Sequence, residues 1–235
     1  MLNAYLARTN QLLQNPAATN ALYSPVDLTA YINSARGQLA GETECVRANG
    51  SLPLTYNTIS YGFASIVPGV AGTAGVFNVR GTTIGIAEGQ VWLAPRPFPY
   101  FQLYYLNNPV PNLGQPHSYS QFGQGETGTL YFWPVPDYGY TASVDVICVP
   151  APLVDDSSPE CIPYPYTDAV PYYAAYLALS SAQRFQDADR MWQQYQTFAT
   201  RARKISNGPV LPQQYPQSPN PVRANQIGMT GSANG

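Results

Sequence analysis

The stretch IPYPYTDAVPYYAAYLALSSAQ, residues 162–183, decides how the chain returns to helical structure near its end. Its second half is typical of a helix, but Pro171 lies close to where that helix begins. With Thr167 or Asp168 as the capping residue, Pro171 falls in the first turn, where backbone amides have no intrahelical partner. A proline there avoids the penalty of roughly 3 kcal/mol that it carries in a helix interior. We therefore expect an unbroken helix that follows a rigid lead-in.

Two further features extend this helical end of the chain. Ala174, Ala175 and Ala178 are small enough to let a neighbouring helix approach closely. Residues 184–206 then place apolar side chains every three or four positions, which predicts an amphipathic helix. The repeating residues are Phe185, Ala188, Trp192, Tyr195, Ala199 and Ala202.

The beginning of the chain also predicts helices. Residues 3–14 carry leucines and a tyrosine at roughly helical intervals, which indicates a short first helix. A second helix starts at Ser24, whose hydroxyl can accept from the free amides of the first turn. Pro25 suits the first helical position, and Asp27 places negative charge at the positive helix end. One apolar stripe follows, and Gly50 ends the segment; the stripe is formed by Leu28, Ile32, Ala35 and Leu39.

The middle of the chain, from about residue 55 to 150, changes to β-branched and aromatic residues at period two, interrupted by Gly, Pro and Asn. Six segments there read as short strands: 54–68, 75–86, 89–95, 100–107, 128–136 and 141–150. Six short strands in fewer than about a hundred residues favour a small antiparallel barrel or sandwich. The fold class is therefore α+β, with an antiparallel-like helical bundle from both chain ends and an inserted β domain.

The composition excludes several classes of protein. Charged residues make up 10% of the chain and the net charge is −2, so a general nucleic-acid binder is excluded. Nineteen tyrosines in so uncharged a chain suggest a surface used for contacts with other chains. The three cysteines have neither disulfide nor zinc-site spacing. We expect no signal peptide and no membrane span.

Four motifs resemble catalytic or cofactor sites without the context that such sites need. GQGETG (123–128) precedes a strand instead of opening a helix, so a hairpin loop is preferred. PGVAGTAG (68–75) lacks the Lys-Ser/Thr ending of a phosphate-binding loop. His117, the sole histidine, is expected in a surface loop. The acidic cluster is expected to be a solvated connector instead of a glycosidase site; its members are Asp155, Asp156 and Glu160. We expect no enzyme, cofactor or metal.

The aromatic runs leave one alternative open. FPYFQLYY (98–105) and YGY (138–140) could form a platform on which sugar rings stack. A β-sandwich glycan-binding or tail-surface protein is therefore the second reading. The first reading is that these tyrosines fill strand cores and subunit contacts.

The two helical ends resemble a known family. The segment LTAYINSARGQLAGETECVR (28–47) and the segment from PYPYTDAV through YYAAYLAL to the arginine-rich helix end (162–203) look like head-to-tail adaptor, or connector, proteins of tailed bacteriophages, with short-tailed phages preferred. The resemblance covers under half of the chain and leaves the β region unmatched.

The resemblance implies a structural protein of the virion, assembled in the host cytoplasm. Such adaptors form a ring, usually of twelve copies, which joins the portal to a nozzle or hub protein of the tail and extends the DNA channel. DNA would pass without specific binding. The four expected parts are residues 1–50 (helices), 51–161 (β insert), 162–205 (helices) and 206–235 (extended proline-rich tail).

Adaptors of this family often send an extended C-terminal segment against the portal, and the proline-rich tail has a similar placement. The residues expected to bind the portal are Arg201, Arg203, Lys204, Ile205, Val210, Leu211, Tyr215 and Arg223. The basic residues at the tail's root have a second interpretation, because cations also stabilise the negative end of a helix.

Overall fold

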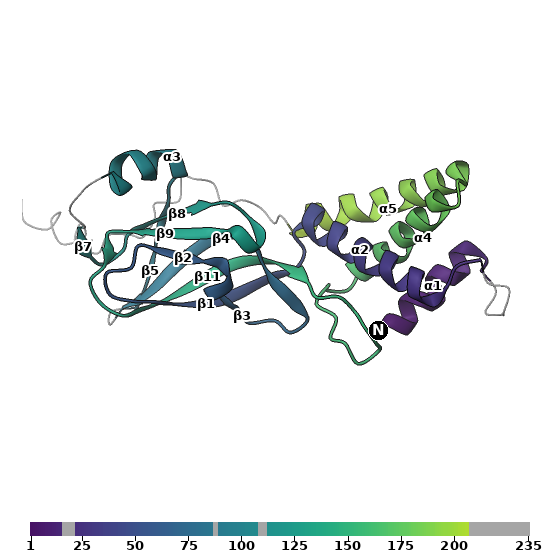
Figure 1. Ribbon diagram of the computed structural model, residues 1–235, viewed down its shortest axis with the longest axis horizontal. Coiled ribbons are helices and arrows are strands. Elements are labelled where there is room, and N and C mark those ends of the chain that lie inside the picture. Colours follow the sequence, from purple (N-terminus) through teal and green to yellow (C-terminus); the bar gives the residue numbers. More distant parts are fainter. Residues whose placement is uncertain (16–21, 87–88, 108–111, 207–235) are drawn as a thin grey trace, which may run out of the picture.

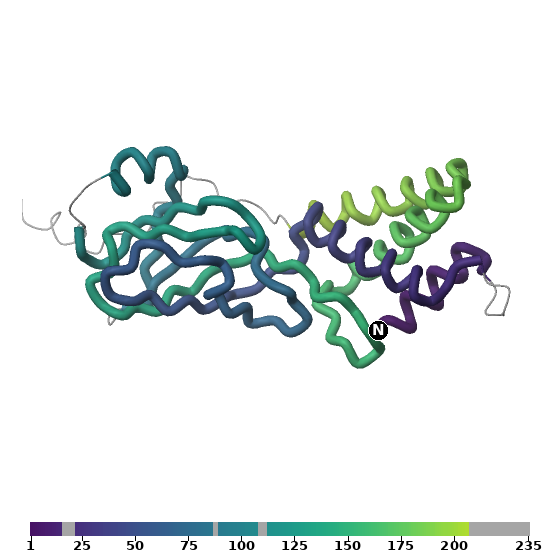
Figure 2. The backbone as a smooth tube through the Cα atoms, viewed as in Figure 1, coloured from purple at the N-terminus to yellow at the C-terminus, as the bar shows by residue number. Residues whose placement is uncertain are grey.

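Four long helices gather at one end of the molecule and the sheets at the other (Figure 1). The computed structural model describes residues 1–15, 22–86, 89–107 and 112–206. The long helices are α1 (Leu2–Leu13), α2 (Pro25–Thr43), α4 (Val170–Ser181) and α5 (Phe185–Ser206). The chain leaves the helices after α2, passes through the sheets and returns to α4 (Figure 2). The α+β class is confirmed.

The start of α2 matches its prediction. Ser24 Oγ accepts from the Asp27 amide at 3.1 Å, and Pro25 occupies the first turn. All four residues of the predicted apolar stripe are buried. The predicted end at Gly50 is wrong, because α2 stops at Thr43 and Arg47 already begins a strand.

The start of α4 confirms the expectation for Pro171 and corrects the one for its cap. Pro171 lies in the first turn of an unbroken helix. Neither Thr167 nor Asp168 acts as the N-cap, because a 3-10 turn, η4 (Tyr166–Ala169), leads directly into the helix. Within that turn the Asp168 amide donates to the Pro165 carbonyl at 3.2 Å, so backbone groups replace a side-chain cap.

Helix α4 lies at the centre of the helical part and contacts α1, α2 and α5. Ala174, Ala175 and Ala178 are fully buried, as their small size predicted. The α5 stripe is confirmed at four of its six positions and half-buried at Trp192. The prediction is wrong at Phe185, which is 64% exposed at the first position of α5, where the helix has no preceding turn.

The strands form three sheets. One has the order β3-β1-β11-β4-β5, one the order β2-β9-β8-β6, and the third pairs β10 with β7. The bounds are β1 (Arg47–Leu54), β2 (Ser60–Gly62), β3 (Val67–Pro68), β4 (Thr73–Ile86), β5 (Gly89–Trp92), β6 (Ala94–Pro95), β7 (Leu113–Gly114), β8 (Ser118–Phe122), β9 (Thr129–Trp133), β10 (Val135–Pro136) and β11 (Tyr140–Pro150). Among the described residues no sheet closes into a barrel.

The two larger sheets share a core. Leu52 and Val144 come from the five-stranded sheet, and Leu130 and Phe132 from the four-stranded one; all four side chains are fully buried in one cluster. Antiparallel pairing dominates, although β6 pairs with β8 and β10 with β7 in parallel. The predicted division into four parts is still a prediction, and its first boundary falls inside β1.

Two strand assignments in the middle of the chain are wrong. Residues 100–107 were expected as a strand but form the end of α3 (Phe98–Phe101) and a π-helical turn, η2 (Gln102–Leu106). Phe101 and Tyr105 are four residues apart, so a helical turn places both on one face. Phe101 is fully buried there, and Tyr105 stacks on Trp133 at 4.7 Å between ring centroids. Strand β8 was missed, because its sequence SYSQF is polar.

Candidate assembly surfaces

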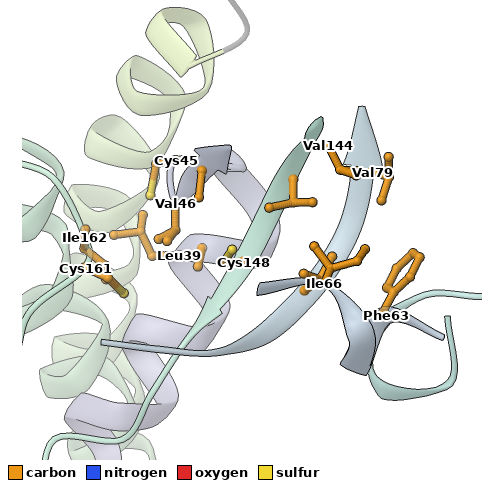
Figure 3. Close-up of a cluster of buried hydrophobic side chains, with 14 of the residues drawn as sticks. Leu39, Cys45, Val46, Phe63, Ile66, Val79, Val144, Cys148, Cys161 and Ile162 are labelled. Carbon is orange, nitrogen blue, oxygen red and sulfur yellow. The ribbon is translucent and has the colours of Figure 1, made fainter. Parts of the chain in front are cut away.

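The helices and the sheets meet in one unbroken apolar core. Figure 3 shows Leu39 of α2, Val46 beside β1 and Ile162 before α4 lying in line with Val144 and Phe63 of the sheet part. All these side chains are buried. The two parts of the molecule therefore form a single packed body at their junction.

The three cysteines lie at this junction. Cys45, Cys148 and Cys161 are free and buried among the described residues (Figure 3). Burial raises the pKa of the Cys148 thiol to about 11, and burial is also the main cause that raises the pKa of Cys161 to about 11. Such thiols are protonated near neutral pH and act as small apolar side chains.

The connector (residues 151–161) fastens the sheets to the helices by a buried ion pair. Arg36 of α2 is 1% exposed and Glu160 is 11% exposed. The Arg36 Nη2 and Nε atoms donate to the two Glu160 oxygens at 2.9 Å and 3.1 Å, and Nη1 donates to the Ala151 carbonyl at 2.6 Å. The Glu160 carboxylate also accepts from the Ile162 amide at 3.0 Å.

A second contact holds the connector to the same helix. The Asn33 side chain donates to the Leu153 carbonyl at 3.0 Å and accepts from the Leu153 amide at 2.8 Å. The three acidic residues of the predicted cluster therefore have different surroundings. Asp155 accepts from Ser157 and Ser158 within an exposed turn, Asp156 accepts from the Asn3 amide, and Glu160 is paired. The expectation of a solvated connector is wrong for Glu160.

The C-terminal end of α5 packs against the C-terminal end of α2. Tyr195 donates to Glu42 at 2.9 Å, Arg203 Nε donates to the Glu42 carbonyl at 3.0 Å, and the Ser206 hydroxyl donates to the Thr43 carbonyl. Arg203 therefore satisfies a carbonyl at the end of α2, whereas the second interpretation of the basic cluster concerned the end of its own helix.

The other root residues of the predicted portal-binding set face solvent. Arg201, Lys204 and Ile205 are exposed, and Arg201 and Lys204 make no hydrogen bond or ion pair with another described residue. Ile205 is an isolated aliphatic side chain beside these two cations. The remaining members of the set lie outside the described residues; they are Val210, Leu211, Tyr215 and Arg223.

The sheet part carries an aromatic ridge, defined as Tyr100, Leu103, Tyr104 and Phe122, all exposed. Tyr100 lies 4.5 Å from Tyr104 between ring centroids, and the Arg96 guanidinium lies 5.7 Å from the Tyr100 ring. Figure 1 places α3, which carries Tyr100 of this ridge, above the sheets and over their half farther from the long helices. Charge and aromatic faces together suit a protein contact.

Single exposed apolar side chains mark two more places. Trp92 is 70% exposed on the edge strand β5 and lies over Gly81, where an added Cβ would stand 2.9 Å from the indole ring. Leu22, Val26 and Phe185 are exposed at the starts of α2 and α5, at the end of the helical part away from the sheets (Figure 1).

The remaining candidate motifs lie in a hairpin loop and at an exposed position. GQGETG lies between the antiparallel strands β8 and β9, with Gly123 and Gly125 at positive φ, so the hairpin prediction is confirmed. His117 is exposed beside β8. In the described ranges no group of three or more His, Cys, Asp or Glu could hold a metal ion. No described helix is both long and apolar enough to cross a membrane.

The comparison with protein families agrees with the resemblance of the helical ends and extends it. The family model described as SU10 adaptor protein matches residues 4–223, which include the sheets as well as the helices. The search of curated proteins found no match. The chain therefore belongs to the SU10 adaptor protein family, a family of phage head-to-tail adaptor proteins.

Proposed function

We propose that this protein forms an adaptor ring, of about twelve copies, that joins the portal vertex to the tail and extends the DNA channel. The observation that carries the proposal is that the two ends of the molecule expose different apolar side chains. The aromatic ridge lies on the sheet part, and Leu22, Val26 and Phe185 are exposed at the starts of α2 and α5.

Two unlike surfaces are what a closed ring of identical subunits requires. In a heterologous interface each copy presents one face to its left neighbour and a different face to its right neighbour. A chain with only 10% charged residues can give up much of its surface to such contacts without leaving many charges buried. The role is structural, with no catalytic step.

The root of the tail suits a portal contact. Arg201 and Lys204 have no described partner, and Ile205 adds an exposed apolar group beside them. These residues, followed by Val210, Leu211, Tyr215 and Arg223, would pair with acidic and apolar groups of the portal. The opposite end would meet a nozzle or hub protein of the tail.

Deleting residues 207–235 tests the portal contact. The truncated protein should stay folded, because α5 is complete at Ser206 and its last contacts lie within the described chain. Circular dichroism should show an unchanged helix signal, while sedimentation with purified portal should show no joint complex. Attachment at full strength would refute the role of the tail.

Mass measurement of the complex tests the ring. Native mass spectrometry of full-length protein with portal should show many adaptor copies per complex, with a common number near twelve. A persistent complex of one adaptor with one portal assembly would refute the ring.

The exposed ridge supports one alternative, a glycan-binding or tail-surface role. Aromatic faces stack on sugar rings, and Tyr100 and Tyr104 are both exposed. A glycan array probed with the wild type and with Tyr104→Ala separates the two functions. Specific binding that the substitution removes would favour the alternative.

A further inference from the structure

A small apolar notch lies where α2 meets the sheets. Its volume is about 100 Å³, and an apolar cavity of about 150 Å³ is known to accept a benzene-sized group. The notch therefore has room for one branched aliphatic side chain. Its lining residues are Gly37, Ala40, Gly41, Phe77, Cys148 and Val149.

Two glycines of this notch have no explanation within the described chain. Gly37 and Gly41 lie one turn apart inside α2, where glycine weakens a helix relative to alanine. Neither has a positive φ that would demand glycine, and a Cβ added at either position would meet nothing within 4 Å. The open side of α2 is thus left free for something that approaches the backbone closely.

The chain leaves the described structure beside this notch. Ser206 and Arg203 at the end of α5 bond to the Thr43 and Glu42 carbonyls, which lie two residues and one residue beyond Gly41. Figure 1 shows α2 and α5 ending together next to the sheets. The last described residue, Ser206, therefore lies at the end of α2, near the notch.

The sequence that follows suits the notch in length and chemistry. Val210 and Leu211 are the aliphatic residues of segment 207–221, and Pro209 and Pro212 flank them. Prolines restrict the backbone, so docking such a segment orders fewer conformations than docking a flexible one. Four or five extended residues span about 13–18 Å, more than the helix diameter of about 10–12 Å, so the pair can pass around the end of α2.

We propose that the notch of each subunit holds Leu211 of its own chain, and so fixes the root of the tail against α2 and the sheets. This goes beyond the proposed function and does not depend on it. The proposed function also gives Leu211 to the portal. The notch and the portal then compete for this side chain, and portal binding requires Leu211 to leave the notch.

A double-mutant cycle on the full-length subunit tests the contact without any portal. Leu211→Ser should raise the unfolding equilibrium constant about fivefold in the wild-type background, since it removes an apolar side chain from the notch. In a Gly41→Leu background, where the new side chain fills the notch, the same change should have no effect. Urea unfolding followed by circular dichroism gives both numbers, and Gln217→Ser serves as the matched polar-segment control. Equal effects in the two backgrounds would overturn the proposal.

Crosslinking gives a second test that does not depend on the stability of the Gly41→Leu variant. A photoreactive benzophenone amino acid in place of Gln213 should crosslink, within the mass of one chain, to peptides that contain Gly41 or Phe77. Leu211→Ser should remove that crosslink. Crosslinks at the mass of two chains, which would put a neighbour's segment in the notch, or crosslinks to other peptides would overturn the proposal.

Discussion

In the helical part the side chains at the closest approach are alanines, whereas between the sheets they are leucine, valine and phenylalanine. Ala174, Ala175 and Ala178 bring α4 close to its neighbours, and Leu130 and Phe132 fill the wider space between the sheets. We therefore expect larger side chains to destabilise the helical part and smaller side chains to destabilise the sheet part. At the junction of the two parts, the buried pair of Arg36 and Glu160 adds a charged contact between α2 and the connector to the apolar core.

The largest expected loss of stability comes from breaking the ion pair of Arg36 and Glu160. Arg36→Met leaves Glu160 buried without its partner and should lower the free energy of unfolding by about 3–5 kcal/mol. Urea unfolding measures it. The double change Arg36→Met with Glu160→Met should recover most of the loss, because apolar groups can replace a buried pair. A double variant no more stable than the single one would show that the loss does not come from leaving Glu160 buried and unpaired.

The second-largest loss of stability should come from removing side-chain volume between the two larger sheets. Leu130→Ala removes a fully buried side chain from between the sheets and should cost about 2–5 kcal/mol. Thermal and urea unfolding both report it. Tyr138→Ala, at an exposed position of the sheet part, is the matched control and should stay within about 0.5 kcal/mol of wild type.

Adding side-chain volume between the helices should lower the free energy of unfolding by a smaller amount. Ala178→Leu forces a larger side chain into the contact of α4 with its neighbours and should cost about 1–3 kcal/mol. Gln194→Leu adds the same residue on an exposed position of α5 and should change stability little. If both substitutions are tolerated equally, the alanines are not setting the helix separation.

The smallest effect should come from an arginine–carboxylate pair on the surface. Arg47 donates through Nε to Asp145 at 2.6 Å, yet its side chain is 54% exposed. Arg47→Ala should lower the free energy of unfolding by less than about 1 kcal/mol, and the loss should shrink in 1 M salt. A loss as large as that of Arg36→Met would contradict the role given to burial.

Features set by neighbouring residues were predictable from the sequence. Ser24 at the start of α2 and Pro171 in the first turn of α4 act through backbone groups a few residues away. Strand β1 was missed because RANGSLPL contains residues that disfavour strands, and its pairing with β11 fixes it from almost a hundred residues away. The aromatic run in α3 was misread because tyrosine and phenylalanine also favour strands, although Pro99 and the spacing of four pointed to a helix.

The candidate surfaces divide in the same way. Arg201 and Lys204 at the root of the tail were found from the sequence, since charge at a helix end is a local signal. The pairing of Arg36 with Glu160 joins positions 124 residues apart, and no local pattern marks it. The aromatic ridge was visible as a run of aromatics, but which rings face solvent depended on the helical turn that the sequence pattern did not reveal.

The unbroken core at the junction has a mechanical consequence. The chain crosses between helices and sheets twice, and Leu39, Val46 and Ile162 are buried in one apolar cluster where these crossings meet the helices. Protein interiors of this density resist compression and pass strain on. We therefore expect the junction to bend little, so that a force applied at the aromatic ridge would displace the helices as well.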